Sequence, residues 1–146
     1  MRHKIVAILF WVAACFLLAS LSTYTPHDIP WESAPVIRPL HNGGGIVGAY
    51  VAYGLLTGLG WSSFLLAFLL GVWGWMAWQG MTFKVAVMRL AGTAVCLLSA
   101  SALWGLGSDD FAARLQHGGV LGVMTAEWLY KYLGLVGAYL IGAGAK

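Results

Sequence analysis

The sequence has 146 residues, of which 60% are apolar and 9% are charged, with a mean hydropathy of +0.81. A soluble domain of this length carries far more charge on its surface, so the composition predicts an integral membrane protein. The net charge of +3 is too small and too dispersed to predict a nucleic-acid-binding surface.

The first predicted element is an apolar span over residues 5–21, which follows Arg2, His3 and Lys4. The apolar core of a signal peptide is about 7–15 residues long. Because this run is longer, we interpret it as an uncleaved membrane span. Residues 22–42 contain all four prolines, which are incompatible with a helix and predict an aqueous loop.

Residues 43–78 are apolar and carry no charge. One helix of that length would reach about 54 Å, whereas the hydrocarbon core is about 30 Å thick. Gly58 and Gly60 favour a break, because each glycine inside a helix costs about 1 kcal/mol relative to alanine. We therefore predict a short interfacial or re-entrant helix at 45–57, which completes an outer loop over residues 22–60, and a second span at 61–78.

After a polar turn at 79–84, a third span is predicted at 85–106. A second outer loop, 107–132, contains an aqueous stretch to His117 and then a short helix over 118–132. The last apolar stretch, 133–145, has 13 residues, about 20 Å as a helix, and is too short to cross. We therefore expect an incomplete fourth span and a chain that is a fragment.

An internal repeat relates the two halves. Gly44, Gly45, Gly48 and Gly60 recur 74 residues later as Gly118, Gly119, Gly122 and Gly134. The sequence thus predicts an all-α membrane protein with about four transmembrane helices in two tandem hairpin repeats, each with a short interfacial Gly-Gly-x-x-Gly helix. These eight glycines are the predicted structural residues. They serve either close helix packing or a turn of positive φ, and the sequence leaves both open.

Charge predicts the orientation. Arg2, Lys4, Lys84 and Arg89 lie at one side of the predicted spans, and all five acidic residues lie at the other. The positive-inside rule places the first group, and with it the N-terminus, in the cytoplasm. The loops 22–60 and 107–132 are then extracytoplasmic.

No pattern in the sequence predicts a catalytic, cofactor-binding, nucleotide-binding or metal site. His41 and His117 precede the glycine pairs, but a polar residue at a loop-to-helix junction explains them more simply. A transporter is expected to carry ionisable groups inside its spans. Here the predicted spans hold only Arg89, which can reach the inner surface.

Several segments together resemble the N-terminal four-span membrane domain of the FtsK/SpoIIIE family of DNA translocases. They are the basic N-terminus with its span, the loop 25–31 (Thr-Pro-His-Asp-Ile-Pro-Trp), the stretch 41–50 (His-Asn-Gly-Gly-Gly-Ile-Val-Gly-Ala-Tyr), Arg89, and the stretch 118–122. The family loop typically has Pro-x-Asp-Pro-x-Trp, so Ile29 is a departure. The resemblance covers nearly the whole chain.

The resemblance implies a membrane anchor and septal scaffold within a translocase that couples cell division to chromosome segregation. It also implies a bacterial inner-membrane location at the division septum, division-machinery membrane proteins as partners, and a hexamer. ATP, Mg²⁺ and DNA are expected only at a motor domain that this chain lacks, so the chain itself is predicted not to be an enzyme. A small four-span transporter or channel subunit is the alternative.

Overall fold

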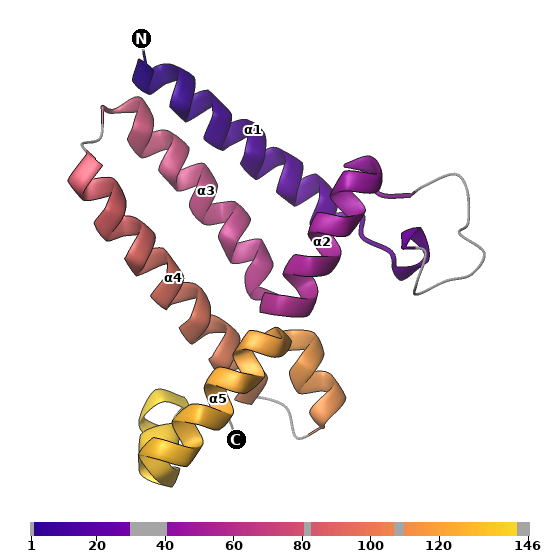
Figure 1. Cartoon of the computed structure of the whole chain (residues 1–146), viewed down its shortest axis with the longest axis vertical. Coiled ribbons are helices and arrows are strands. Elements are labelled where there is room, and N and C mark those ends of the chain that lie inside the picture. Colours follow the sequence, from indigo (N-terminus) through magenta and orange to yellow (C-terminus); the bar gives the residue numbers. More distant parts are fainter. Residues whose placement is uncertain (1, 30–40, 81–82, 107–109, 143–146) are drawn as a thin grey trace. The chain divides into compact units, whose positions relative to one another are not determined.

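The computed structural model describes residues 2–29, 41–80, 83–106 and 110–142, and throughout those ranges the regular elements are helices (Figure 1). They are α1 (Arg2–Ser22), the 3₁₀ turn η1 (Pro26–Asp28), α2 (Gly45–Leu59), α3 (Ser62–Trp78), α4 (Phe83–Leu106) and α5 (Phe111–Gly142). The predicted all-α membrane class is confirmed.

Two helices are long and apolar enough to cross a membrane, namely α1 over His3–Ser22 and α4 over Met88–Gly105. The pair α2 and α3, which meet at a bend of 112°, adds a third candidate within the described part of the chain. Apolar residues occur on every side of α1, and Ile5, Leu9 and Val12 are exposed on it. Such a surface is stable in lipid and not in water.

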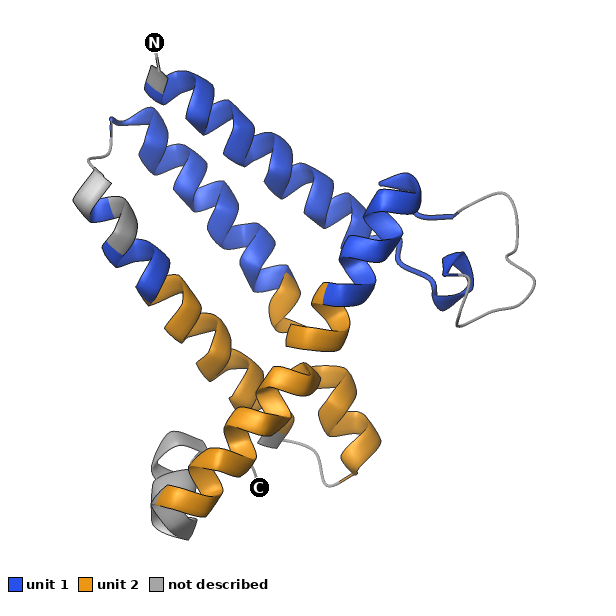
Figure 2. Cartoon of the chain, viewed as in Figure 1, with its two compact units in different colours: residues 1–54, 64–91 blue, residues 55–63, 92–146 orange. Residues whose placement is uncertain are grey.

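The chain forms two compact units, residues 1–54 with 64–91 and residues 55–63 with 92–146 (Figure 2). In the first unit, α1 and α3 lie side by side. The indole N–H of Trp11 donates a hydrogen bond to the carbonyl of Gly71 at 3.1 Å, and the rings of Trp11 and Trp78 stack with centroids 5.7 Å apart. Ala7, Ala67 and Ala77 are buried and let the helices approach.

The break between α2 and α3 is a turn at Gly60, whose φ is +60°. A residue with a Cβ is strained in this left-handed region, so a glycine ends α2 here. The hydroxyl of Ser63 then donates to the carbonyls of Leu55, at 2.8 Å, and Gly60, at 2.7 Å. These carbonyls belong to the last turn of α2 and would otherwise lack partners at its C-terminus.

Helix α5 differs from the sequence-based expectation. An aqueous loop was expected as far as His117, followed by a separate short helix and a fourth span starting at 133; instead, α5 runs without interruption from Phe111 to Gly142. Residues 112–116 (Ala-Ala-Arg-Leu-Gln) are good helix formers, which explains the early start. Gly119, with φ of +67°, bends α5 but does not end it, and the change of direction is visible in Figure 1.

The packing of α1 on α3 generates the first prediction. A Cβ at Gly74 would lie 2.5 Å from Nε1 of Trp11 and 3.1 Å from the carbonyl oxygen of Ala7, whereas a Cβ at Gly71 would meet nothing within 4 Å. Both glycines are inside α3, so alanine improves helix propensity equally at each. We expect Gly74→Ala to be less stable than Gly71→Ala by about 1–3 kcal/mol, because only the former overpacks the contact. Thermal unfolding in detergent measures the difference, and equal stability would contradict the packing described.

Candidate functional site

Within the first unit, the end of α1 meets the start of α2 at Gly44 and Gly48. A Cβ at Gly44 would collide with the hydroxyl oxygen of Ser20, and one at Gly48 would lie 2.6 Å from the same atom. Ser20 is fully buried. Two backbones are therefore held together by glycines on one helix and a small polar residue on the other, a contact typical of membrane helices.

Asn42 joins the same two helices by hydrogen bonds and is buried. Its side-chain amide donates to the carbonyl of Ser20 at 2.8 Å, a carbonyl at the C-terminal end of α1. Its side-chain oxygen accepts the N–H of Gly44 at 2.9 Å, and its backbone carbonyl accepts the N–H of Gly45 at 2.9 Å. Asn42 thus satisfies backbone groups at one helix end and before the next, as a capping residue does.

Asp28 closes the first loop. Its carboxylate accepts a hydrogen bond from the hydroxyl of Thr25 at 2.9 Å and from the backbone N–H of His41 at 3.1 Å, and its side chain is buried. Nδ1 of the His41 imidazole lies 3.9 Å from the same carboxylate. The two ends of the segment between Asp28 and His41 are therefore tied directly to each other.

Burial alone raises the pKa of Asp28, because it disfavours the charged form. The backbone N–H of His41, the hydroxyl of Thr25, the charge of His41 and the backbone of Asn42 act in the opposite direction and outweigh burial. The pKa of Asp28 is therefore below its ordinary value, and the carboxylate is ionised near neutral pH.

The second unit contains a tighter contact between the α2–α3 turn and α5. A Cβ at Gly60 would collide with the carbonyl oxygen of His117, and one at Gly119 would lie 2.5 Å from the carbonyl oxygen of Gly58. The backbone N–H of Trp61 donates to the carbonyl of His117 at 2.9 Å. Here the backbones themselves are in contact, so only glycine fits at the two positions of positive φ.

The same unit repeats the serine contact. The hydroxyl of Ser101 on α4 donates to the carbonyl of Leu59 at 3.2 Å. A Cβ at Gly118 would lie 2.7 Å from the carbonyl oxygen of Ser101, and one at Gly122 would collide with that oxygen. Ser101 is fully buried, like Ser20 in the first unit.

The predicted glycines thus fall into three groups. At six of them, neighbouring atoms are so close that an added Cβ would clash; these are Gly44, Gly48, Gly60, Gly118, Gly119 and Gly122. Gly45 has φ of +64° but open space around it, so its conformation and not its packing requires glycine. Gly134 lies inside α5, and its surroundings are outside the described residues.

Sequence reasoning did not identify Ser20, Asn42 and Ser101 as the partners of these glycines, nor Asp28 as the residue that closes the loop. A signal existed for the serines, since each is a small polar residue late in an apolar helix. Ser99 gives the same signal on α4, so only the structure distinguishes Ser101.

Chemically, these contacts hold helix ends and a loop; they bring together no nucleophile with a base. Groups of three or more His, Cys, Asp or Glu that could bind a metal ion are not found within the described ranges. What the arrangement provides is a fixed geometry at one end of each helix pair.

The fold and these contacts define an all-α, multi-pass membrane domain held by glycine and serine contacts. The chain belongs to the FtsK/SpoIIIE family, since its residues 1–144 match the family described as the 4TM region of DNA translocase FtsK/SpoIIIE. The resemblance identified from the sequence is therefore confirmed.

Curated relatives with similar sequences carry the name of the same family. The chain is 30% identical over 139 residues to a DNA translocase FtsK of Azospirillum brasilense, covering 92% of this chain and 22% of the relative. It is 25% identical over 141 residues to one of Shewanella oneidensis, covering 92% and 15%, and 24% identical over 132 residues to one of Rickettsia prowazekii, covering 90% and 17%. The chain thus spans less than a quarter of the length of these relatives. No solved structure matches the chain significantly.

The repeat provides a matched pair of variants for the two roles of glycine. Gly45 and Gly119 are equivalent positions, both with positive φ, but only Gly119 is enclosed by backbone. Alanine costs about 1–2 kcal/mol at either position through backbone strain. We expect Gly119→Ala to cost about 1–3 kcal/mol more than Gly45→Ala because of the added overpacking. Chemical unfolding in detergent measures this difference. An equal loss of unfolding free energy in both variants would show that the close backbone contact at Gly119 does not contribute to stability.

A second prediction concerns Asp28 and pH. Its pKa is lower in the folded state, so its stabilising contribution is fully present above the unfolded value of about 3.9 and is lost as pH falls through the folded value. We expect Asp28→Asn to lower the apparent Tm at pH 7 and the gap to wild type to close on acidification. Asp110→Asn, which removes an exposed carboxylate, is the control. A gap of constant size down to pH 2 would show that the charge of Asp28 does not contribute.

Proposed function

We propose that this chain is the membrane anchor and septal scaffold of a DNA translocase that couples cell division to chromosome segregation. The observation that carries the proposal is the family match over residues 1–144, which is confined to the membrane region of that family. The three relatives compared above are named DNA translocases, and this chain covers only 15–22% of their length. The role assigned to the chain is therefore holding and positioning.

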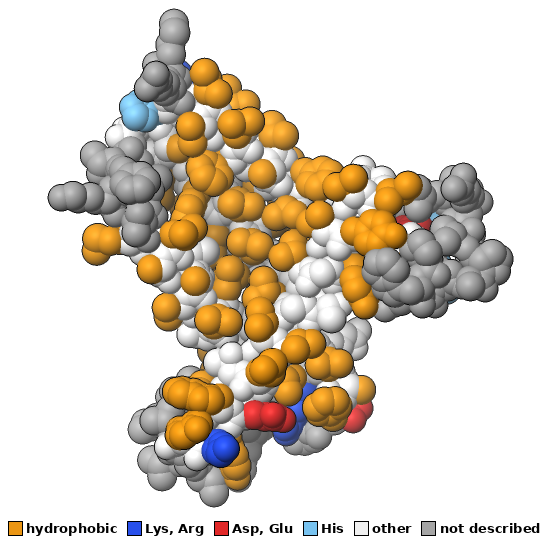
Figure 3. Space-filling model, viewed as in Figure 1, with side chains coloured by type: hydrophobic (Ala, Val, Ile, Leu, Met, Phe, Trp, Pro, Cys, Tyr) orange, Lys and Arg blue, Asp and Glu red, His pale blue; other side chains and the backbone are white. Residues whose placement is uncertain are grey.

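The anchoring part of the proposal follows from the surface of the helices. In the first unit, hydrophobic side chains cover the visible face over α1 and α3 (Figure 3). Each buried methylene contributes about 0.8 kcal/mol, so a full span is held in a bilayer almost irreversibly. A motor attached to such spans remains at the membrane while it exerts force on DNA.

We further propose that the N-terminus is cytoplasmic and that the membrane is the bacterial inner membrane. In the first unit, Nζ of Lys4 lies 5.2 Å from the centroid of the Trp78 ring, so a cation and an aromatic side chain occur together at one end of α1 and α3. Lysine and tryptophan are typical of the membrane–water interface, and lysine favours the cytoplasmic side. A motor that follows in the full-length protein would then be on the side where the chromosome is.

The scaffold part concerns partners. Division-machinery membrane proteins are the proposed contacts, and a hexamer is the proposed assembly, both by family resemblance. ATP and Mg²⁺ are assigned to the motor, and DNA contacts this protein only through that motor. The Gly-Gly-x-x-Gly contacts are proposed to keep the loop ends fixed so that partners meet a defined surface.

Fluorescence imaging in dividing bacteria tests this function. We expect a tagged version of the chain to form a midcell band that is several times brighter than the lateral membrane. An unrelated membrane span carrying the same tag is the control and should label the membrane evenly. Even labelling by both proteins would exclude the scaffold role and favour a transporter or channel subunit.

A further inference from the structure

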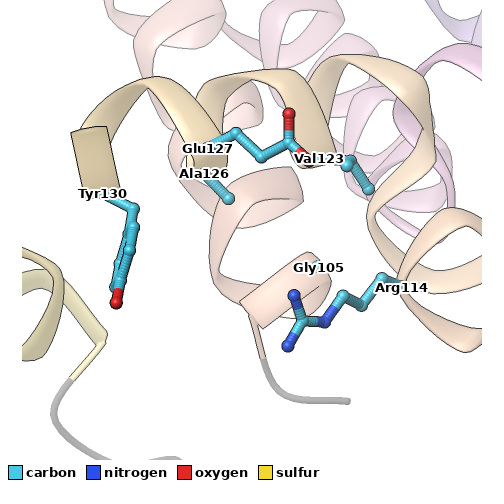
Figure 4. Close-up of a pocket in the computed structure, with 6 residues that line it drawn as sticks. All are labelled: Gly105, Arg114, Val123, Ala126, Glu127 and Tyr130. Atoms are coloured by element: carbon cyan, nitrogen blue, oxygen red, sulfur yellow. The ribbon is translucent and has the colours of Figure 1, made fainter. Parts of the chain in front are cut away.

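The second unit contains a half-open cavity of about 150 Å³ beside the C-terminal end of α4 (Figure 4). A single water molecule needs far less space. Among the described residues, those that line the cavity are Gly105 of α4 and Arg114, Val123, Ala126, Glu127 and Tyr130 of α5. Neither the glycine contacts nor the proposed anchoring uses it.

Helix α4 indicates the level of the cavity relative to the membrane. The apolar stretch of this helix that can cross a membrane ends at Gly105, which lines the cavity. Its neighbour Trp104 is 46% exposed and makes an edge-on contact with Trp61 at 5.4 Å between centroids. Exposed tryptophan is enriched at the level of the lipid headgroups. The cavity therefore lies beside the end of the candidate span of α4, the level at which headgroups are expected.

The lining combines opposite charges with apolar walls. Arg114 offers a planar guanidinium, which binds phosphate through two parallel hydrogen bonds, and Tyr130 offers a phenolic hydroxyl. Figure 4 shows these two side chains extending from different turns of α5 on either side of Gly105. Glu127 supplies a carboxylate that attracts a cation, and Val123 and Ala126 supply the apolar wall.

We propose that this cavity binds the headgroup of phosphatidylethanolamine, with the lipid phosphate on Arg114 and the primary ammonium on Glu127. One cationic and one anionic side chain complement a zwitterion better than a purely anionic headgroup, which Glu127 would repel. A primary ammonium donates hydrogen bonds to a carboxylate, whereas the quaternary ammonium of choline has no hydrogen to donate. Glu127 therefore selects ethanolamine over choline, and Arg114 provides affinity for both.

Native mass spectrometry of the detergent-purified chain tests the site. Phosphatidylethanolamine, phosphatidylcholine and phosphatidylglycerol with identical acyl chains are added separately. We expect one tightly retained lipid per chain, with phosphatidylethanolamine retained about tenfold better than either of the others, as a charge-assisted hydrogen bond implies. Equal retention of all three lipids would overturn the proposal.

Variants separate the two roles. Glu127 is exposed, so Glu127→Gln leaves the packing intact and is expected to reduce the preference for ethanolamine over choline to about one. Arg114→Gln is expected to weaken retention of both lipids about tenfold. Lys131→Gln, which removes an exposed cation that does not line the cavity, is the control and should behave as wild type. An unchanged preference in Glu127→Gln would overturn the assignment.

Soluble phosphoethanolamine distinguishes a lipid from a free ligand of the same chemistry. We expect it to displace the lipid only at concentrations at least a hundredfold higher, because it lacks the acyl chains that anchor the headgroup beside α4. Displacement at equal concentration would assign the cavity to a soluble ligand and would overturn the lipid proposal.

Discussion

In lipid, two apolar helices gain nothing by leaving water, so their association depends on close van der Waals contact and on hydrogen bonds between them. Both units meet this constraint at the end of a helix, where glycine allows backbone approach and a buried serine lies opposite. Ser20 faces Gly44 and Gly48 in the first unit, and Ser101 faces Gly118 and Gly122 in the second. The ends of α2 and the bend in α5 depend on these contacts.

Polar groups are confined to the same places. The buried polar side chains of the described residues are Ser20, Asp28, Asn42, Ser62, Ser63 and Ser101, and all lie at or near helix ends. A helix end carries backbone groups without partners, and in a membrane each such group costs several kcal/mol. Asn42 and Ser63 supply those partners, which leaves the middle of the helices free to be apolar.

This separation connects the packing with the proposed functions. Apolar helix surfaces anchor the chain but offer no specificity, so recognition falls to the helix ends and loops. The loop closed by Asp28 and the charged cavity of α5 are both of this kind, one proposed to contact protein partners and the other a headgroup. An anchor that also recognises its surroundings needs both types of surface.

The sequence by itself determined the membrane class and the family, because composition and a repeat at a spacing of 74 residues are visible without coordinates. It also pointed to glycines that pack closely or have positive φ, but not to Gly74, which lies against Trp11. Only the tertiary structure decided why each glycine is needed. Gly45 and Gly119 are equivalent in the repeat, yet open space surrounds one and backbone encloses the other. The sequence analysis also predicted a loop to His117, a helix over 118–132 and a separate span from 133, where the structure has one helix from Phe111 to Gly142. The physical reason is that close approach depends on residues far apart in the chain, such as Gly58 with Gly119 and Ser20 with Gly48, and local patterns carry no information about such distances.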